Sequence, residues 1–535
     1  MLRRLSILLL GVLLITPALA QDAAAPAGNW KLAFFSEGRL QPLWIVSFEQ
    51  KDGKWTGKTL DTSEGVAPGE VSKVAVKDGQ LSFTFTLKSP RGSRELTFEG
   101  KLPKEKGKKI LGSVALGRQS IIGELAPTEA KSFNDRLVLT KERVENAIGP
   151  ELFEASLELL SQAEKEKATP EQVRSWANKV VSAAEAYGPR WQLNIAGNVA
   201  EILSEQKGFE GVAVEYAQRA RRLMDDDTEP MTQVRVLNLL SEVLTKAGKA
   251  DDAKTITAEA DKIYLKNMPP YKVEKFAGRK NKKGQTVLLE LFTGAECPPC
   301  VAADLAFDGI EKSYDPGEVV LLQYHLHIPR PDPLTNEDTE ARMSYYEDEI
   351  GGTPTVLFNG RLKPKTGGGG GFDDAKEKYS IYREAIDPIL ETESPVTVKA
   401  KAVRKGDKID ITAEASGIDK PNEKLRLRLA LVEDKVRFTG GNTLRFHHQV
   451  VRALPGGAKG FPIKDKSIKE EITVDLAHVK ETLTKYLDKY NKEKQPFPRT
   501  DRPLDLKDLK VVAFVQNDEN KDVLAAVQVP VEAAE

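Results

Sequence analysis

Residues 287–301, VLLELFTGAECPPCV, decide how the middle of this 535-residue chain folds. The stretch opens with an apolar run that is typical of a buried strand. Thr293, Gly294 and Ala295 interrupt that run, and the motif C-P-P-C follows at once. Residues 301–307, VAADLAF, then have the composition and apolar spacing of a helix. The order predicts a strand, a short loop, a C-x-x-C motif and a helix.

The two cysteines of this motif are the predicted chemical centre. Cys297 precedes the helix, where unpaired N–H groups and the helix dipole favour thiolate over thiol, so we expect it to be the exposed nucleophile. Cys300 lies one turn later, facing the core, where it can attack a mixed disulfide. The chain has no other cysteine, which excludes a Cys-rich zinc site or a second disulfide. An inert local disulfide is the alternative.

Two flanking segments carry a family resemblance. Residues 290–293 (ELFT) and 352–356 (GTPTV) resemble the corresponding parts of a thioredoxin-fold domain. In thioredoxins a cis-proline closes over the reactive disulfide, so the resemblance implies a cis Thr353–Pro354 bond and a substrate-binding role for both residues. The pattern ELFT…CxxC…TPTVxxNG, with YHLH between, is closer to an uncharacterised family of secreted bacterial thioredoxin-like proteins. The similarity spans about residues 283–360.

The resemblance departs from thioredoxin at one position. Thioredoxin carries a buried Asp that helps to move protons, whereas this chain has Leu291 with Glu290 beside it. Glu290 is therefore a candidate for proton transfer, although alternation along a strand points it to the other face of the sheet.

Two histidines follow a second predicted strand, residues 319–324. His325 and His327 are spaced i, i+2, so both side chains can face the same way. Their ordinary pKa suits proton transfer near the disulfide, and copper or zinc would accept such ligands. The proline-rich residues 329–333 instead predict that a surface loop begins here. We therefore expect solvated or hydrogen-bonded histidines, with no metal and no cofactor.

The first 20 residues have the pattern of an export signal. Arg3 and Arg4 precede an apolar segment, and Ala18-Leu19-Ala20 is a small-x-small cleavage site. The apolar segment is too short to span a membrane comfortably, and no later segment reaches the ~18 apolar residues that a spanning helix needs. The sequence predicts a soluble, periplasmic or secreted protein.

Charge limits the kinds of partner that we expect, and length limits the number of domains. Lys and Arg number 79 against 80 Asp and Glu, so no electrostatic argument favours nucleic acid as a partner. The length predicts roughly three to five domains, and the overall class is multidomain α+β.

The chain before the redox motif divides into a segment of predicted strands and a segment of predicted helices. Residues 28–126 read as short alternating strands and predict an all-β meander or barrel domain. Residues 130–267 predict a helical domain that resembles tetratricopeptide repeats, because a Gly-and-Ala pattern recurs at an offset of 40 residues, from Gly208 to Gly248. This helical domain either binds a protein partner or serves as a spacer.

The segments around and after the motif complete the prediction. Residues 272–393 form the thioredoxin-like α/β domain, which ends in a helix over residues 373–390, and the five glycines 367–371 predict a flexible loop. Residues 394–535 predict an immunoglobulin-like β-sandwich with a helix inserted near residues 476–490.

The predicted function is an exported thiol–disulfide oxidoreductase. It would act on protein disulfides through Cys297 and Cys300, together with a redox partner. Two alternatives remain open. One is a redox-inert thioredoxin-like scaffold, and the other is a metal (copper) carrier that uses both cysteines with His325 and His327.

Overall fold

The computed structural model describes residues 25–36, 38–89, 92–117, 119–281 and 283–534. The predicted export signal lies outside these ranges. Within them the chain is mixed α+β, with two sheets and 11 α-helices. It divides into two compact units, Met1–Thr257 and Ala258–Glu535, each described below by itself. None of the described helices combines the length and apolar character needed to cross a bilayer.

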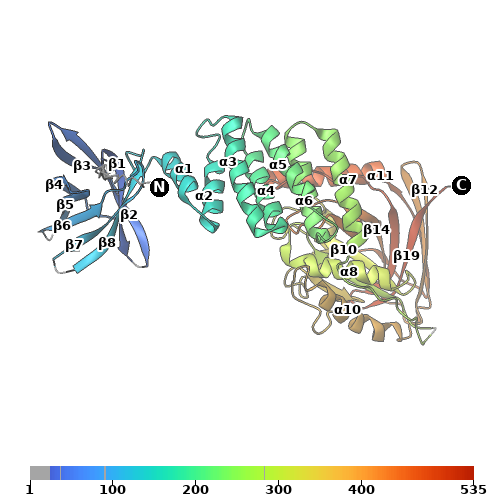
Figure 1. Ribbon diagram of the computed structural model, residues 1–535. Helices are drawn as coiled ribbons and strands as arrows, with labels where there is room; N and C mark the ends of the chain where they lie inside the picture. The colour runs from blue at the N-terminus through green and yellow to red at the C-terminus, as the bar shows by residue number, and fades with distance from the viewer. Residues whose placement is uncertain (1–24, 37, 90–91, 118, 282, 535) are drawn as a thin grey trace, which may run out of the picture. The chain divides into compact units, whose positions relative to one another are not determined.

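The first unit begins with an eight-stranded antiparallel sheet that is nearly closed into a barrel (Figure 1). Its strands are β1 (Gly28–Ser36), β2 (Arg39–Lys51), β3 (Lys54–Thr62), β4 (Gly69–Lys77), β5 (Gln80–Ser89), β6 (Gly92–Lys101), β7 (Ile110–Leu116) and β8 (Gln119–Thr128). They lie in the order β3-β2-β1-β8-β7-β6-β5-β4, so the first and last strands pair.

The barrel interior is filled by aromatic side chains. Trp44, Phe83, Phe85 and Phe98 are all buried there, and Gly69 lets one ring approach closely, since a Cβ at this position would lie 2.1 Å from Phe85. Strand β8, at the end of the predicted all-β range, does not follow the alternating pattern. Its adjacent isoleucines break the alternation that marks a half-buried strand, and Ile122 is 60% exposed.

Seven helices follow. They are α1 (Arg136–Asn146), α2 (Pro150–Ser161), α3 (Pro170–Ala183), α4 (Pro189–Ser204), α5 (Glu210–Arg222), α6 (Pro230–Lys246) and α7 (Ala250–Asn267). The repeated glycines Gly208 and Gly248 have φ values of +87° and +75°, which favour glycine. Each lies in the turn before a helix, α5 or α7. The repeat in the sequence therefore marks equivalent turns.

The second unit contains a mixed sheet. Its elements are β9 (Val287–Thr293), α8 (Val301–Ser313), β10 (Val319–His325), α9 (Glu337–Tyr345), β11 (Thr355–Phe358), α10 (Ala375–Leu390), β12 (Thr397–Lys405), β13 (Lys408–Ser416), β14 (Leu425–Arg437), β15 (Phe446–Ala453), β16 (Phe461–Pro462), β17 (Ile468–Asp475), α11 (Leu476–Glu493), β18 (Leu509–Asn517) and β19 (Val523–Ala533). The order is β11-β9-β10-β15-β14-β18-β19-β12-β13-β17, with β16 beside β14.

Strands β9 and β10 are parallel and are buried along their whole length. One face, with Leu289 and Leu291, packs in a core that α8 and α10 cover. The other face, with Leu288 and Phe292, packs in a core to which β14 and β18 contribute, for example through Phe514. Burial on both faces explains why these strands read as continuous apolar runs.

The strands after residue 394 belong to the same sheet as β9–β11. They join it where Gln323 of β10 pairs with Val450 of β15. A further core lies between β12, β13 and β17, strands β14 and β18, and helix α11. The helix predicted within this segment is α11. The separate immunoglobulin-like sandwich and the domain boundaries stay predictions.

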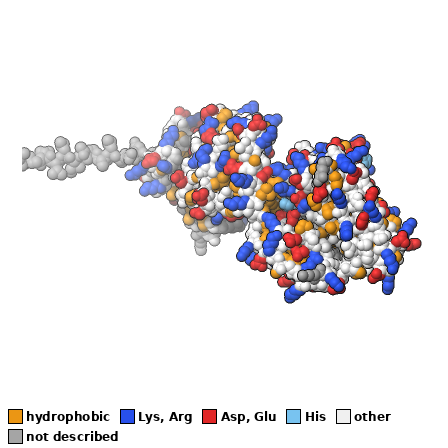
Figure 2. Space-filling view, turned by 90° about the vertical axis from the view of Figure 1, so that its right-hand side faces the viewer, with side chains coloured by type: hydrophobic (Ala, Val, Ile, Leu, Met, Phe, Trp, Pro, Cys, Tyr) orange, Lys and Arg blue, Asp and Glu red, His pale blue; other side chains and the backbone are white. Residues whose placement is uncertain are grey.

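The surface shows both signs of charge. Figure 2 shows Lys and Arg side chains interspersed with Asp and Glu on the visible face. This agrees with the nearly cancelling charge totals of the chain.

Candidate functional site

The two cysteines form a disulfide between β9 and α8. Pro298–Cys300 is a single 3-10 turn that leads into α8, so the predicted order of strand, loop, motif and helix is present. Both cysteines are buried, Cys297 with 1% and Cys300 with 0% of its surface exposed. The expectation that Cys297 is exposed was therefore wrong, because segments distant in the sequence pack around the motif.

The Thr353–Pro354 segment is the first of these neighbours. The Thr353–Pro354 peptide bond is cis, as predicted. Thr353 Oγ1 lies 3.4 Å from Cys297 Sγ. The structure therefore brings together the predicted nucleophile and the predicted substrate-binding threonine.

The five-glycine segment is the second neighbour. Gly370 N–H donates to Pro299 O at 2.8 Å, and Ala302 N–H donates to Gly370 O at 3.0 Å. A Cβ at Gly369 would lie 2.5 Å from Pro299 Cβ. The glycines of this segment allow its backbone to reach the motif, although four of the five are exposed. The expected flexibility stays a prediction.

A loop between β14 and β15 is the third neighbour. Asn442 N–H donates to Ala295 O at 3.0 Å, and a Cβ at Gly440 would lie 2.3 Å from the same oxygen. Glu296, directly before Cys297, is buried beneath this loop and lies 3.1 Å from Arg330. Burial raises the pKa of Glu296, although the charge of Arg330 opposes this effect.

His325 and His327 meet at one residue, Asp332. His325 Nδ1 lies 2.9 Å from Asp332 Oδ2, and Asp332 N–H donates to His327 Nδ1 at 2.9 Å. Asp332 also accepts a hydrogen bond from Ala295 N–H at 2.5 Å, which ties both histidines to the loop before Cys297. Both are hydrogen-bonded, as expected. The expected surface loop over residues 329–333 is confirmed only at its start, because residues 329–330 are exposed whereas residues 331–333 are buried.

The remaining contacts of these residues set their protonation. Burial would raise the pKa of Asp332, but the charge of His325 and the N–H groups outweigh it and lower that pKa. His327 Nε2 lies 3.0 Å from Tyr486 Oη, and burial lowers the pKa of His327 to about 4. Both nitrogens of His327 are thus engaged.

Glu290 faces away from α8. Arg342 donates to its two oxygens at 2.7 and 2.9 Å, and Tyr346 Oη–H donates at 2.8 Å. It lies on the face of β9 that carries Leu288 and Phe292, as alternation predicts. The carboxylate therefore has a charged partner in the core and does not face the helix that follows the disulfide.

Asp304 is a buried acid that the sequence analysis missed. It lies on α8, four residues after Cys300, and is 4% exposed. Thr293 Oγ1–H donates to Asp304 Oδ2 at 3.0 Å. Burial raises the pKa of Asp304 well above its ordinary value, and the hydrogen bond from Thr293 only partly opposes this. An acid one helical turn after the second cysteine is the signal that could have identified it.

Two further histidines come from β15. The His447 and His325 rings pack edge to face with centroids 4.9 Å apart, and burial lowers the pKa of His447 to about 3. His448 instead faces α8, with Nε2 3.9 Å from Asp308. Among the described residues, no three His, Cys, Asp or Glu side chains are grouped so as to hold a metal ion.

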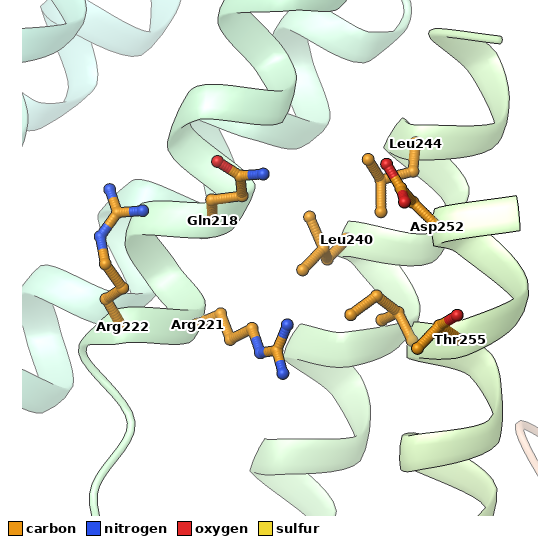
Figure 3. Close-up of a pocket in the computed structure, with 8 residues that line it drawn as sticks. Gln218, Arg221, Arg222, Leu240, Leu244, Asp252 and Thr255 are labelled. Carbon is orange, nitrogen blue, oxygen red and sulfur yellow. The ribbon is translucent and has the colours of Figure 1, made fainter. Parts of the chain in front are cut away.

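A separate pocket lies in the first unit, between α5, α6 and α7. Its volume is about 630 Å³. Figure 3 shows Gln218, Arg221 and Arg222 of α5 on one side of it, with Leu240, Leu244, Asp252 and Thr255 of α6 and α7 opposite. It combines an apolar wall with charged groups. Partner binding by the helical segment stays a prediction.

Comparisons with known proteins do not assign this chain to a family. No protein family and no curated protein matches this chain. Among solved structures, HBP35 of Porphyromonas gingivalis has a TM-score of 0.33 and 18% sequence identity, over 47% of this chain and 77% of that chain. This similarity is too low to support an inference.

Proposed function

We propose that this chain is an exported, thioredoxin-like thiol–disulfide oxidoreductase that acts on protein disulfides. The proposal is carried by one observation: a Cys297–Cys300 disulfide between a buried strand and a helix, with Thr353 Oγ1 3.4 Å from Cys297 Sγ. Such an arrangement brings a substrate backbone and a reactive sulfur side by side.

The exchange has two steps. A client thiolate attacks Cys297 Sγ, the Cys297–Cys300 bond breaks, and a mixed disulfide forms while the electron pair leaves on Cys300 Sγ. In the opposite direction the Cys300 thiolate attacks the mixed disulfide at Cys297 and releases the client thiolate. Thr353 would orient the client next to the sulfur.

Burial of both cysteines supports one alternative, a redox-inert scaffold. Reactive cysteines usually lie in partly exposed sites, whereas buried ones are inert, and here the exposed fractions are 1% and 0%. The oxidoreductase therefore requires that a segment contacting the motif moves. The segments that contact it include residues 353–354, the glycines 367–371 and the 440–442 loop.

Trapping of mixed disulfides tests the proposal. Cys300→Ser keeps the attacking sulfur but cannot resolve the intermediate, so it should accumulate client adducts that disappear when reductant is added. Cys297→Ser is the matched control and should trap almost nothing, because it lacks the sulfur that lies beside Thr353 and that forms the bond to the client. Adducts are counted on non-reducing gels of exported proteins.

A second measurement distinguishes the oxidoreductase from the redox-inert scaffold. The wild-type protein should equilibrate with a dithiol buffer and give a defined midpoint potential. If the disulfide resists reduction in the folded protein and both variants trap nothing, the scaffold replaces the oxidoreductase.

A further inference from the structure

Helix α8 carries three acids at helical spacing, and the outer two lie near His448 of β15. Asp304, Asp308 and Glu311 are spaced i, i+4 and i+7, which places them on one face of the helix. Asp304 is buried, the Asp308 side chain is 14% exposed and the Glu311 side chain is 32% exposed. We name these three residues the α8 acid row. The row runs from the disulfide end of the helix in the core toward solvent.

The inner end of the row lies one helical turn after Cys300. Side chains on a helix lean toward its N-terminus, so the Asp304 carboxyl leans toward the turn that carries Cys300. Its Oδ2 accepts from Thr293, whereas its Oδ1 is buried without a hydrogen-bond partner among the described residues. A buried carboxyl with one unpartnered oxygen is unusual and calls for an explanation.

The outer part of the row contacts β15 and β18. His448 Nε2 lies 3.9 Å from Asp308, and His448 Nδ1 lies 3.7 Å from Glu311. Lys510 Nζ of β18 lies 3.7 Å from Glu311. These contacts extend the row to a partly exposed surface.

Other elements also face the row. The charged and titratable groups whose electrostatics act on Asp304 or Asp308 are Asp332, His448, Glu311 and Lys312, and the phenols of Tyr264, Tyr271 and Tyr382 lie within their electrostatic reach. Burial raises the pKa of Asp308 to about 6, and the charge of His448 opposes this. Both inner acids therefore hold protons at a higher pH than ordinary aspartates do.

We propose that the α8 acid row carries protons between solvent and the buried sulfur of Cys300. When a thiolate attacks Cys297 Sγ and the disulfide breaks, Cys300 leaves with the electron pair and takes the proton of the Asp304 carboxyl. Asp304 is then reprotonated from solvent through Asp308, Glu311 and His448. In the reverse step the Cys300 thiol returns its proton to the Asp304 carboxylate. The inference rests on the proposed thiol–disulfide exchange.

The pH profile of disulfide opening tests this. The rate at which a small monothiol opens the disulfide is measured in the full chain and divided by the fraction of that monothiol present as thiolate. In the wild type the corrected rate should fall as pH rises through the pKa of Asp304, because the proton donor is lost. In Asp304→Asn the corrected rate should not depend on pH. At low pH it should be about 100-fold lower than in the wild type, the usual loss when a general acid is removed.

Two further variants test whether the proton moves along the α8 acid row. Asp308→Asn should slow opening less than Asp304→Asn does and should leave part of the pH dependence. Asp315→Asn is the matched control, because Asp315 is exposed just beyond the end of α8 and outside the row. It should reproduce the wild-type profile. Circular dichroism and thermal unfolding verify that each variant is folded.

The outcomes separate the two proposals. If no thiol opens the disulfide of the folded wild-type protein, the proposed function fails. If the monothiol opens the disulfide of the wild type, and Asp304→Asn has the same corrected rate and pH profile as the wild type, the exchange stands and the proton path is wrong. A profile altered equally by Asp315→Asn would also contradict the path.

Discussion

Strand β9 has a buried carboxyl group on each of its two sides, and the two groups differ in their partners. On one side Glu290 receives two hydrogen bonds from Arg342. On the other side Thr293 donates to Asp304, which no cation contacts in the described structure. The first arrangement holds a charge in place, whereas the second favours a neutral acid that can take up or release a proton. A buried acid is thus informative about function only when its partners are known.

Removal of the Glu290 charge should have the largest effect. Glu290→Gln leaves Arg342 charged and uncompensated in the core, which should lower the free energy of unfolding of the second unit by about 3–5 kcal/mol. Urea unfolding of the full chain measures this. The double variant Glu290→Met/Arg342→Met removes both charges and should recover most of the loss. A single variant as stable as the wild type would contradict the structural role of the pair.

Asp308→Asn should have the second-largest effect, which is on the pH dependence of the free energy of unfolding. A raised pKa in the folded state means that stability is lost as pH rises from the ordinary pKa of Asp through about 6. The Asn variant lacks this loss, so its stability relative to wild type should improve between pH 4 and pH 7 by up to about 3 kcal/mol. Urea unfolding at both pH values measures the difference. An unchanged difference would show that Asp308 titrates normally.

The smallest effect is expected at Thr293. Thr293→Val removes the hydrogen bond to Asp304, which should cost about 1 kcal/mol of stability and raise the pKa of Asp304 further, because that bond favours the ionised form. The fall in corrected opening rate should therefore move to higher pH. In Thr293→Val/Asp304→Asn the shift should vanish, since the two residues act on one proton. A profile that does not move would leave Asp304 outside the reaction.

Local patterns in the sequence correctly placed the elements around the motif. The apolar run before Cys297 and the helical spacing after Cys300 correspond to β9 and α8, because a buried strand and an amphipathic helix each leave a periodicity in the chain. The recurring glycines Gly208 and Gly248 likewise correspond to equivalent turns, because their positive φ angles favour a residue without a Cβ. Alternation likewise placed Glu290 on the face opposite Leu291.

Beyond Thr353 and Pro354, the surroundings of the motif were decided by tertiary structure alone. Thr353 contacts Cys297, and the glycines 367–371 and the 440–442 loop contact the residues around it. These segments lie roughly 50 to 150 residues away in the chain and leave no local periodicity. The contact of His448 with Asp308 likewise needs β15 to join the sheet beside β10.

The sequence by itself therefore determined the elements, their order and the pair of cysteines, since these follow from residue types and spacing. Tertiary structure decided how exposed the sulfurs are and which acids lie near them. The physical reason is that exposure, charge pairing and pKa depend on desolvation and on contacts between distant segments. Asp304 and Glu290 are both acids in apolar surroundings in the sequence, and only the position of Arg342 in the fold distinguishes them.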